Sequence, residues 1–192
     1  MPKLDSVCVF LGSSTGTNPA NASATVSMGE ALLERGLRLV YGGGNAGLMG
    51  LLANTVLDGG GEVLGVIPRN LFSKEVAHRG LTELIETDSM HERKALMYEH
   101  SDAFAALPGG LGTLDEIAEI ATWRQIQLHD KPVGVVNTDG YYDHLLGWLD
   151  RVTADGLMSA NNRLHIHEGS SPEELLDLFA GEQPIAEAKW DS

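Results

Sequence analysis

Short runs rich in β-branched and other apolar residues alternate with helical patterns along most of this chain, and this alternation is the feature that most restricts its fold. Such alternation is typical of βαβ units, in which helices join parallel strands and cover the sheet. The run Val133-Gly134-Val135-Val136 is apolar on both faces, as expected of a strand between two helical layers. We therefore predict an α/β fold, a Rossmann-like open parallel sheet with helices on both faces. Strands are expected at residues 7–11, 37–41, 63–67, 104–107, 133–137 and 164–167.

The length of 192 residues fits one domain with one hydrophobic core. We predict a single α/β domain over residues 1–180 and a polar, acidic tail over residues 181–192. Helix starts are predicted where an N-cap residue is followed by proline, or by glutamate three residues on. These starts lie at Asn18-Pro19, Ser89 to Glu92, Thr113 to Glu116 and Ser171 to Glu174.

The charge of the chain restricts its partners. The 27 acidic residues outnumber the 13 basic ones, so the field around the protein repels nucleic acid and anionic membrane surfaces. No stretch approaches the roughly 20 apolar residues of a membrane span, and the first apolar run is too short for the core of a signal peptide. The single cysteine, Cys8, cannot form an internal disulfide, and its apolar neighbours favour core packing. Together these features favour a cytoplasmic protein with no nucleic-acid or membrane partner.

Glycine clusters follow three of the predicted strands, at residues 12–14, 42–47 and 108–113. Ligands bind open parallel sheets beyond the carboxyl ends of the strands, so these three loops are expected to converge on one site. The third cluster leads into the helix predicted to begin near Thr113. Backbone N–H groups without helical partners and the helix dipole favour an anion such as phosphate there. The alternative is a tight strand-to-helix turn that binds no ligand.

Of two standard nucleotide-binding motifs, one is absent from the chain and the other is matched only in part. The chain contains no Gly-x-x-x-x-Gly-Lys-Ser/Thr, which argues against a nucleoside triphosphatase built on that loop. Gly42-x-Gly44-x-x-Gly47 matches the dinucleotide pattern. However, the acidic residue expected at the end of the next strand is absent, because that strand runs into Pro68-Arg69. An NAD-type oxidoreductase is therefore an alternative rather than the first hypothesis.

Two longer motifs carry a family resemblance. The segment from Pro108 to Glu116, Pro-Gly-Gly-Leu-Gly-Thr-Leu-Asp-Glu, matches the P-G-G-x-G-T-x-x-E (PGGxGTxxE) signature of the LONELY GUY family. Residues 90–94, Met-His-Glu-Arg-Lys, resemble its companion segment, and residues 42–50 are similar to family sequences as well. The resemblance implies a phosphoribohydrolase that cleaves cytokinin riboside 5'-monophosphates, or AMP, into a free base and ribose 5-phosphate. It makes the domain a nucleotide-binding hydrolase.

The resemblance also implies roles for single residues, with Arg93 and Glu116 as the catalytic pair. It further implies a homodimer with active sites near the subunit interface, and a reaction that requires no metal or organic cofactor. Many members carry an older label, lysine decarboxylase, but no lysine here has a setting that singles it out for a Schiff base with pyridoxal phosphate. The expected contacts to the nucleoside 5'-monophosphate are Gly12, Ser13, Glu75, Arg93, Lys94, Gly109, Gly110, Leu111, Gly112, Thr113, Glu116 and Thr122.

The roles of the charged residues have structural alternatives. Cleavage of a ribosyl N-glycosidic bond builds positive charge on the sugar, which a shielded Glu116 carboxylate can stabilise while it orients or deprotonates water. The alternative is that Glu116 only closes a capping box with Thr113. Arg93 and Lys94 lie in the first turn of their helix, where cations oppose the dipole. This placement favours their orienting the nucleotide or Glu116 over a solvated surface pair. Glu92 is assigned a capping role alone.

The remaining candidates favour structural roles. His165 and His167 alternate along a predicted strand, as two metal ligands would, but no third ligand follows at a suitable spacing. A partly exposed strand face is the favoured interpretation, and His91 is expected on a helix surface. Trp123 and Arg124 fit either core or subunit contacts. A non-catalytic nucleotide-binding module is the alternative from a different functional class.

Overall fold

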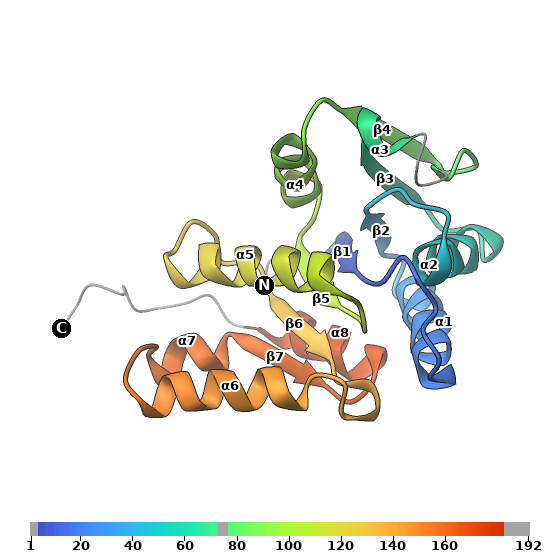
Figure 1. The fold of residues 1–192 in the computed structure, drawn as a ribbon. Helices are drawn as coiled ribbons and strands as arrows, with labels where there is room; N and C mark the ends of the chain where they lie inside the picture. Colours follow the sequence, from blue (N-terminus) through green and yellow to red (C-terminus); the bar gives the residue numbers. More distant parts are fainter. Residues whose placement is uncertain (1–3, 73–76, 183–192) are drawn as a thin grey trace.

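The computed structural model describes residues 4–72 and 77–182, and it confirms an α/β fold built on one open sheet (Figure 1). The strand order is β4-β3-β2-β1-β5-β6-β7, and every neighbouring pair is parallel. The strands are β1 (Ser6–Phe10), β2 (Arg38–Tyr41), β3 (Val63–Pro68), β4 (Glu83–Thr87), β5 (Ala103–Ala106), β6 (Val133–Val136) and β7 (Ile166–Gly169).

Helices cover both faces of the sheet, as predicted. Val7 and Val9 of β1 pack with α1, α2 and α8 on one face, whereas Cys8 and Phe10 pack with α4, α5 and α6 on the other. No helix in the described ranges is long and apolar enough to cross a membrane. The helices are α1 (Pro19–Glu34), α2 (Gly47–Asp58), α3 (Arg69–Phe72), α4 (Met90–Glu99), α5 (Leu111–Gln125), α6 (Asp143–Ala154), α7 (Ala160–Leu164) and α8 (Pro172–Gly181), with a 3-10 turn η1 (Thr138–Gly140).

The order of the strands reverses at the centre of the sheet. The strands β1 to β4 follow one another toward one edge, after which the chain returns to place β5 beside β1 and continues to β7 at the other edge. The loop after β1 leads to α1 on one face of the sheet, and the loop after β5 leads to α5 on the other face. Open α/β sheets bind their ligands at such a switch point.

All six predicted strands are present, and one further strand is not among them. The unpredicted strand, β4, has the sequence Glu-Leu-Ile-Glu-Thr and lies at an edge of the sheet, where most of its side chains are exposed or half-buried. Acidic residues are typical of edge strands and weaken the strand signal in the sequence. At the other edge, the predicted start of β7 is wrong by two residues, because Leu164 ends α7 and the strand begins at Ile166.

Three of the four predicted helix starts are confirmed. The side chains of Asn18, Ser89 and Ser171 accept hydrogen bonds from the backbone at the starts of α1, α4 and α8. The start predicted near Thr113 is wrong, because α5 begins at Leu111 with Gly110 as its N-cap and no side-chain cap. The extended backbone of Gly110 takes the N-cap position, which leaves Thr113 inside the first helical turn.

Candidate active site

The three glycine segments meet at the switch point, as the sequence predicts. The Gly12 N–H donates to the carbonyl of Pro108 at 3.2 Å, which joins the loops after β1 and β5. Gly47 has a positive φ of 56°, and a methyl group on it would overlap the carbonyl of Ser13. The close approach of these backbones therefore requires glycine at position 47.

The loop after β2 is held in place by the surrounding structure. The Tyr41 hydroxyl donates to the carbonyl of Gly44 at 3.0 Å, and the His78 N–H donates to the carbonyl of Gly43 at 3.0 Å. The ring of His78 in turn lies 2.9 Å from Asn54 Oδ1 on α2. This loop is therefore a fixed wall of the site.

The start of α5 presents backbone amides without a side-chain cap. The first N–H group that donates within the helix is that of Leu114, to the carbonyl of Gly110. The N–H groups of Leu111, Gly112 and Thr113 therefore have no intrahelical acceptor and are available to an anion, and the helix dipole favours negative charge there. A methyl group on Gly110 or Gly112 would meet nothing within 4 Å. Packing inside the chain therefore does not account for these two glycines.

Arg93 is buried beneath this loop, with only 6% of its surface exposed. Its Nε donates to the carbonyl of Val66 and its Nη2 to the carbonyl of Gly42, both at 3.1 Å. A methyl group on Gly42 would overlap Nη2, so glycine at this position makes room for the guanidinium. The alternative of a solvated surface cation is therefore wrong for Arg93.

Glu116 lies beside this arginine and is also buried, with 8% of its surface exposed. Its Oε1 is 3.9 Å from Arg93 Nη1. Burial raises the pKa of the Glu116 carboxyl, although the charges of Arg93 and Lys94 act in the opposite direction. Because Thr113 is not the N-cap, a capping box between Thr113 and Glu116 is excluded as the explanation of this carboxylate.

Lys94 joins α4 to α5 at the rim of the same site. Its Nζ lies 2.7 Å from Asp115 Oδ2 and 3.2 Å from Glu119 Oε2. Burial alone would lower the pKa of the ammonium, but hydrogen bonds and charges from the two carboxylates outweigh it and raise the pKa. Lys94 therefore remains a cation near the amides of α5.

Neither lysine in the described ranges is suited to a Schiff base with pyridoxal phosphate. Lys94 is held as an ammonium by two carboxylates, whereas Schiff-base chemistry needs a neutral amine. Burial lowers the pKa of Lys131, but its Nζ donates to the carbonyl of Tyr98 at 2.8 Å. Lys131 also precedes β6, so it lies at the opposite end of the sheet from the switch point.

One of the expected nucleotide contacts among the described residues, Thr122, does not join this cluster. Glu75 lies outside the described residues. Thr122 is exposed on α5, roughly 9 Å along the helix axis from Glu116 and on a different face. The others gather around the start of α5, where Gly110, Leu111 and Gly112 are exposed and Thr113 is buried.

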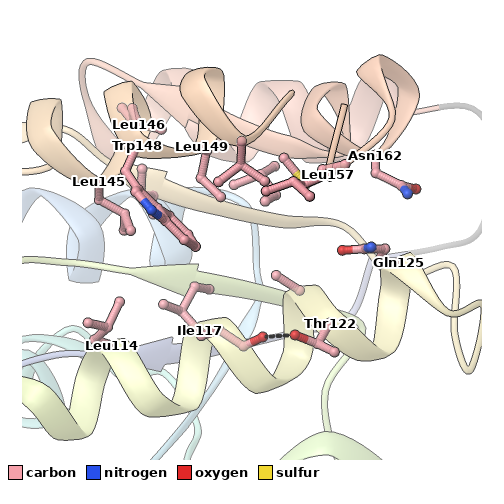
Figure 2. Close-up of a pocket in the computed structure, with 16 residues that line it drawn as sticks. Leu114, Ile117, Thr122, Gln125, Leu145, Leu146, Trp148, Leu149, Leu157 and Asn162 are labelled. Atoms are coloured by element: carbon pink, nitrogen blue, oxygen red, sulfur yellow. Dashed lines mark hydrogen bonds between the residues drawn. The ribbon is translucent and has the colours of Figure 1, made fainter. Parts of the chain in front are cut away.

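Thr122 instead lines a groove between α5 and α6, shown in Figure 2. This α5–α6 groove has a cavity volume of about 550 Å³ and a mostly apolar lining. Two of its side chains are strongly exposed, Trp148 at 60% and Leu157 at 78%. The residues that line it are Leu114, Ile117, Ala118, Ala121, Thr122, Gln125, Val135, Leu145, Leu146, Trp148, Leu149, Val152, Leu157, Met158, Asn162 and Ile166.

The remaining candidates have structural environments. His165 follows α7 and His167 lies in β7, so the two do not alternate along one strand as predicted. Arg124 is buried and paired with Glu182, which also lies 3.2 Å from His167 Nε2. Among the described residues, no group of three His, Cys, Asp or Glu side chains could hold a metal ion. Trp123 packs edge-on against the ring of Tyr98, and His91 is exposed as expected.

Tyr141 and Tyr142 contact the loop before α5 and are absent from the predicted site. The Tyr141 hydroxyl donates to the carbonyl of Gly109, and the Tyr142 hydroxyl donates to the carbonyl of Leu107 at 2.7 Å. Their position in the sequence could have indicated this contact. Both tyrosines follow the strand predicted at residues 133–137, and the carboxyl end of that strand lies at the same edge of the sheet as the glycine loops.

These features define a Rossmann-like α/β protein with an uncapped helix start and a buried arginine–glutamate pair at its switch point. A family model described as "Possible lysine decarboxylase" matches residues 49–179. The chain belongs to this family, the LONELY GUY family, which includes proteins named cytokinin riboside 5'-monophosphate phosphoribohydrolases.

Individual relatives resemble nearly the whole chain. The cytokinin riboside 5'-monophosphate phosphoribohydrolase LOG5 of Arabidopsis thaliana is 44% identical over 190 residues, which cover 96% of this chain and 83% of the relative. The probable enzyme of the same name, LOGL1, of Oryza sativa subsp. japonica is 49% identical over 170 residues, covering 88% and 76%. A molybdenum cofactor binding protein from Rippkaea orientalis shares the fold at a TM-score of 0.68 and 23% identity, covering 94% of this chain and 98% of that one.

Proposed function

We propose that this protein hydrolyses the N-glycosidic bond of cytokinin riboside 5'-monophosphates and of AMP, releasing an adenine-type base and ribose 5-phosphate. The observation that carries the proposal is the buried Glu116–Arg93 pair beside the uncapped start of α5. The two relatives above, at 44% and 49% identity, carry the name of this activity. The family label of lysine decarboxylase is not supported by the settings of Lys94 and Lys131.

The spacing of the site suits a nucleoside monophosphate. In the proposed complex the phosphate accepts hydrogen bonds from the amides of Gly110 to Thr113. Glu116 lies one helical turn further along α5, and a turn of helix advances roughly 5.4 Å. The ribose ring spans this gap, so its C1' atom faces the carboxylate of Glu116. Lys94 is the expected cationic contact to the nucleotide, although Asp115 and Glu119 balance its charge in the free protein, so the amides of α5 carry most of the attraction for the phosphate.

Glu116 carries the chemistry in this arrangement. As the bond between C1' and the base nitrogen breaks, its electron pair leaves with the base and positive charge develops on the ribose. The carboxylate stabilises that charge and takes a proton from the water that attacks C1'. The departing base takes up one proton in return, so the hydroxyl of water ends on C1' and its proton ends on the base. A raised pKa makes Glu116 a better base than an exposed glutamate, and the low solvent exposure strengthens its electrostatic effect.

Arg93 positions this carboxylate. Two of its nitrogens are held by the carbonyls of Val66 and Gly42. The third, Nη1, donates to Met90 Sδ at 3.5 Å and lies 3.9 Å from Glu116 Oε1. The fixed guanidinium favours the ionised form of Glu116 and orients it toward the ribose. The same guanidinium fills the space beside Gly42, so the dinucleotide pattern at residues 42–47 lends no support to an NAD-type oxidoreductase.

We also propose that the protein acts in the cytoplasm as a homodimer formed through the α5–α6 groove. Trp148 and Leu157 expose apolar surface in this groove that a second copy of the chain would cover. Thr122, an expected substrate contact, lies in the groove and would then be near the subunit interface. The cytoplasmic location is supported by the only cysteine, Cys8, which is a buried free thiol.

Incubation with AMP and with isopentenyladenosine monophosphate tests the proposed reaction, with free base and ribose 5-phosphate as the measured products. Glu116→Gln and Arg93→Ala should each lower turnover by roughly 10² or more, since they remove transition-state electrostatics. Glu92→Gln is the matched control, because this exposed carboxylate only caps α4 through the Asp88 N–H. Near-normal rates in both site variants contradict the roles assigned to Glu116 and Arg93. Tight AMP binding by the unaltered protein without base release favours a non-catalytic nucleotide-binding module.

A further inference from the structure

A tyrosine outside the family motifs holds the loop in which the phosphate is proposed to bind. The hydroxyl of Tyr141, on the segment that follows η1, donates a hydrogen bond to the backbone carbonyl of Gly109. The ring of Tyr141 is 48% exposed and packs edge-on against Tyr142, with ring centroids 5.0 Å apart. Tyr141 therefore lies at the surface of the site rather than in the hydrophobic core.

The bond from Tyr141 determines the direction of one amide. A peptide unit is planar and trans, so the carbonyl of Gly109 and the N–H of Gly110 point in opposite directions. A hydroxyl that holds the carbonyl on one side therefore presents the N–H of Gly110 on the other side. This peptide has glycine at both ends, so rotation of the whole unit meets little steric resistance without such a restraint. A rotated unit would direct its carbonyl, with a partial negative charge, toward the phosphate.

The segment that carries Tyr141 is itself well fixed. Asp139 and Gly140 both have positive φ values, 52° and 70°, which is uncommon for aspartate. The Asn18 side chain donates to Asp139 Oδ2 at 2.9 Å, and the Tyr142 N–H donates to Asn137 Oδ1 at 2.7 Å. Two consecutive left-handed residues, held from both sides, thus turn the chain so that the Tyr141 hydroxyl reaches Gly109.

We propose that Tyr141 is a positioning residue that keeps the Gly109–Gly110 peptide in the orientation that binds phosphate. The inference rests on the proposed function, because it requires the start of α5 to be the phosphate site. Tyr141 acts through the backbone of the loop, so it affects the binding of the phosphate group rather than the cleavage of the glycosidic bond. Loss of the hydroxyl therefore raises KM and leaves kcat nearly unchanged, since phosphate binding contributes equally to the ground and transition states.

The test compares Tyr141→Phe with Tyr142→Phe in the full-length protein. The adjacent tyrosines each donate one hydrogen bond to a carbonyl of the same segment, but Tyr142 is buried and bonds Leu107, at the end of β5. For Tyr141→Phe we expect about a tenfold rise in the KM for AMP and in the Kd for inorganic phosphate measured by calorimetry. Inhibition by free adenine, which has no phosphate, should change less than about twofold, and the Tm should be unchanged. For Tyr142→Phe we expect a lower Tm with phosphate affinity within about twofold of the unaltered protein.

Several outcomes would overturn the inference. An unchanged KM and phosphate Kd in Tyr141→Phe would show that the hydroxyl does not set the orientation of the loop. An equal loss of phosphate affinity in both variants would indicate general loosening instead of a specific role for Tyr141. If the unaltered protein binds phosphate but releases no base from AMP, the proposed reaction fails while the phosphate titrations still test Tyr141. If the unaltered protein does not bind phosphate at all, the role of Tyr141 fails as well.

Discussion

The burial of Glu116 and Arg93 costs folding free energy, whatever role the two side chains have. A carboxylate and a guanidinium lose hydration when they are buried, and a separation of 3.9 Å between Oε1 and Nη1 recovers only part of that loss. The pKa of Glu116 is raised for the same reason, because the loss of hydration on burial outweighs the attraction of the nearby positive charges. The pair is therefore expected to make this region less stable than an uncharged equivalent, as the proposed catalytic role would require.

The pH dependence of folding should reveal this cost. The pKa of Glu116 is higher in the folded state than in the unfolded chain, so its contribution to stability is fully present below the unfolded pKa and is lost as pH rises through the folded pKa. We expect the free energy of unfolding of Glu116→Gln, minus that of the unaltered protein, to increase as the pH rises across that window. At neutral pH the variant should be the more stable of the two proteins. Urea unfolding of both proteins from pH 4 to pH 8 provides the measurement. Parallel pH profiles would contradict the proposed desolvation of the carboxylate.

Gly42 offers a second test at the level of one residue. A methyl group there would overlap Arg93 Nη2, so Gly42→Ala should displace the guanidinium and lower turnover of AMP by at least about tenfold, although residue 42 is not itself an expected substrate contact. The control is Gly147→Ala in α6, where a methyl group would meet nothing within 4 Å. Equal kcat/KM values in the two variants would show that the position of Arg93 is unimportant.

The sequence indicated that Arg93 is not an ordinary surface cation, but it did not indicate which groups surround the guanidinium. A cation in the first turn of a helix opposes the dipole, and this conflict is visible from the residue order alone. Its actual partners are the carbonyls of Val66 and Gly42, on two other segments of the chain. Every residue has a carbonyl, so no pattern of side chains indicates which ones will be used. Tyr141 is missed for the same reason, because its acceptor is the carbonyl of Gly109.

At the level of elements, the predictions succeed where a helix start or strand has a strong local signal. The N-caps Asn18, Ser89 and Ser171 are all confirmed. The start of α5 is displaced by two residues from the prediction, since Thr113 resembles an N-cap while Gly110 takes that position without a side-chain bond. The strand β4 escapes prediction because an edge strand with two glutamates resembles a loop. Both errors arise where tertiary structure overrides local preference.

The cap of α4 links helix stability to the site. The Ser89 side chain accepts a hydrogen bond from the Glu92 N–H, and Arg93 follows in the same turn. Loss of this cap in Ser89→Ala should destabilise the protein by about 1 kcal/mol. Because the first turn of α4 also carries Arg93, the variant should turn over AMP more slowly. Ser171→Ala removes a cap of the same geometry from α8, which lies away from Arg93 and Glu116. It should lose similar stability with normal turnover. Denaturant unfolding and steady-state rates of the two variants provide the measurement. Equal activity in both variants would disprove the link between the cap and the site.

At the level of the whole molecule, the α5–α6 groove should control assembly. A charge at Leu157, which is exposed in this groove, would have to be buried in the proposed dimer, so Leu157→Glu should convert the dimer to a monomer. Leu128→Glu is the control, because Leu128 is also exposed but does not line the groove. Light scattering after gel filtration gives the mass of each species. A dimer that persists in Leu157→Glu, or an unaltered protein that is already monomeric, contradicts the proposed interface.

The strand order brings the parts of the site together, because it places β5 beside β1 although β2, β3 and β4 lie between them in the sequence. The most direct test of the resulting account is a crystal structure of Glu116→Gln with AMP. We predict phosphate oxygens within hydrogen-bonding distance of the amides of Gly110 to Thr113, and the ribose C1' atom facing the side chain at position 116. A phosphate bound away from those amides, or a C1' atom out of reach of that side chain, would contradict the proposed site.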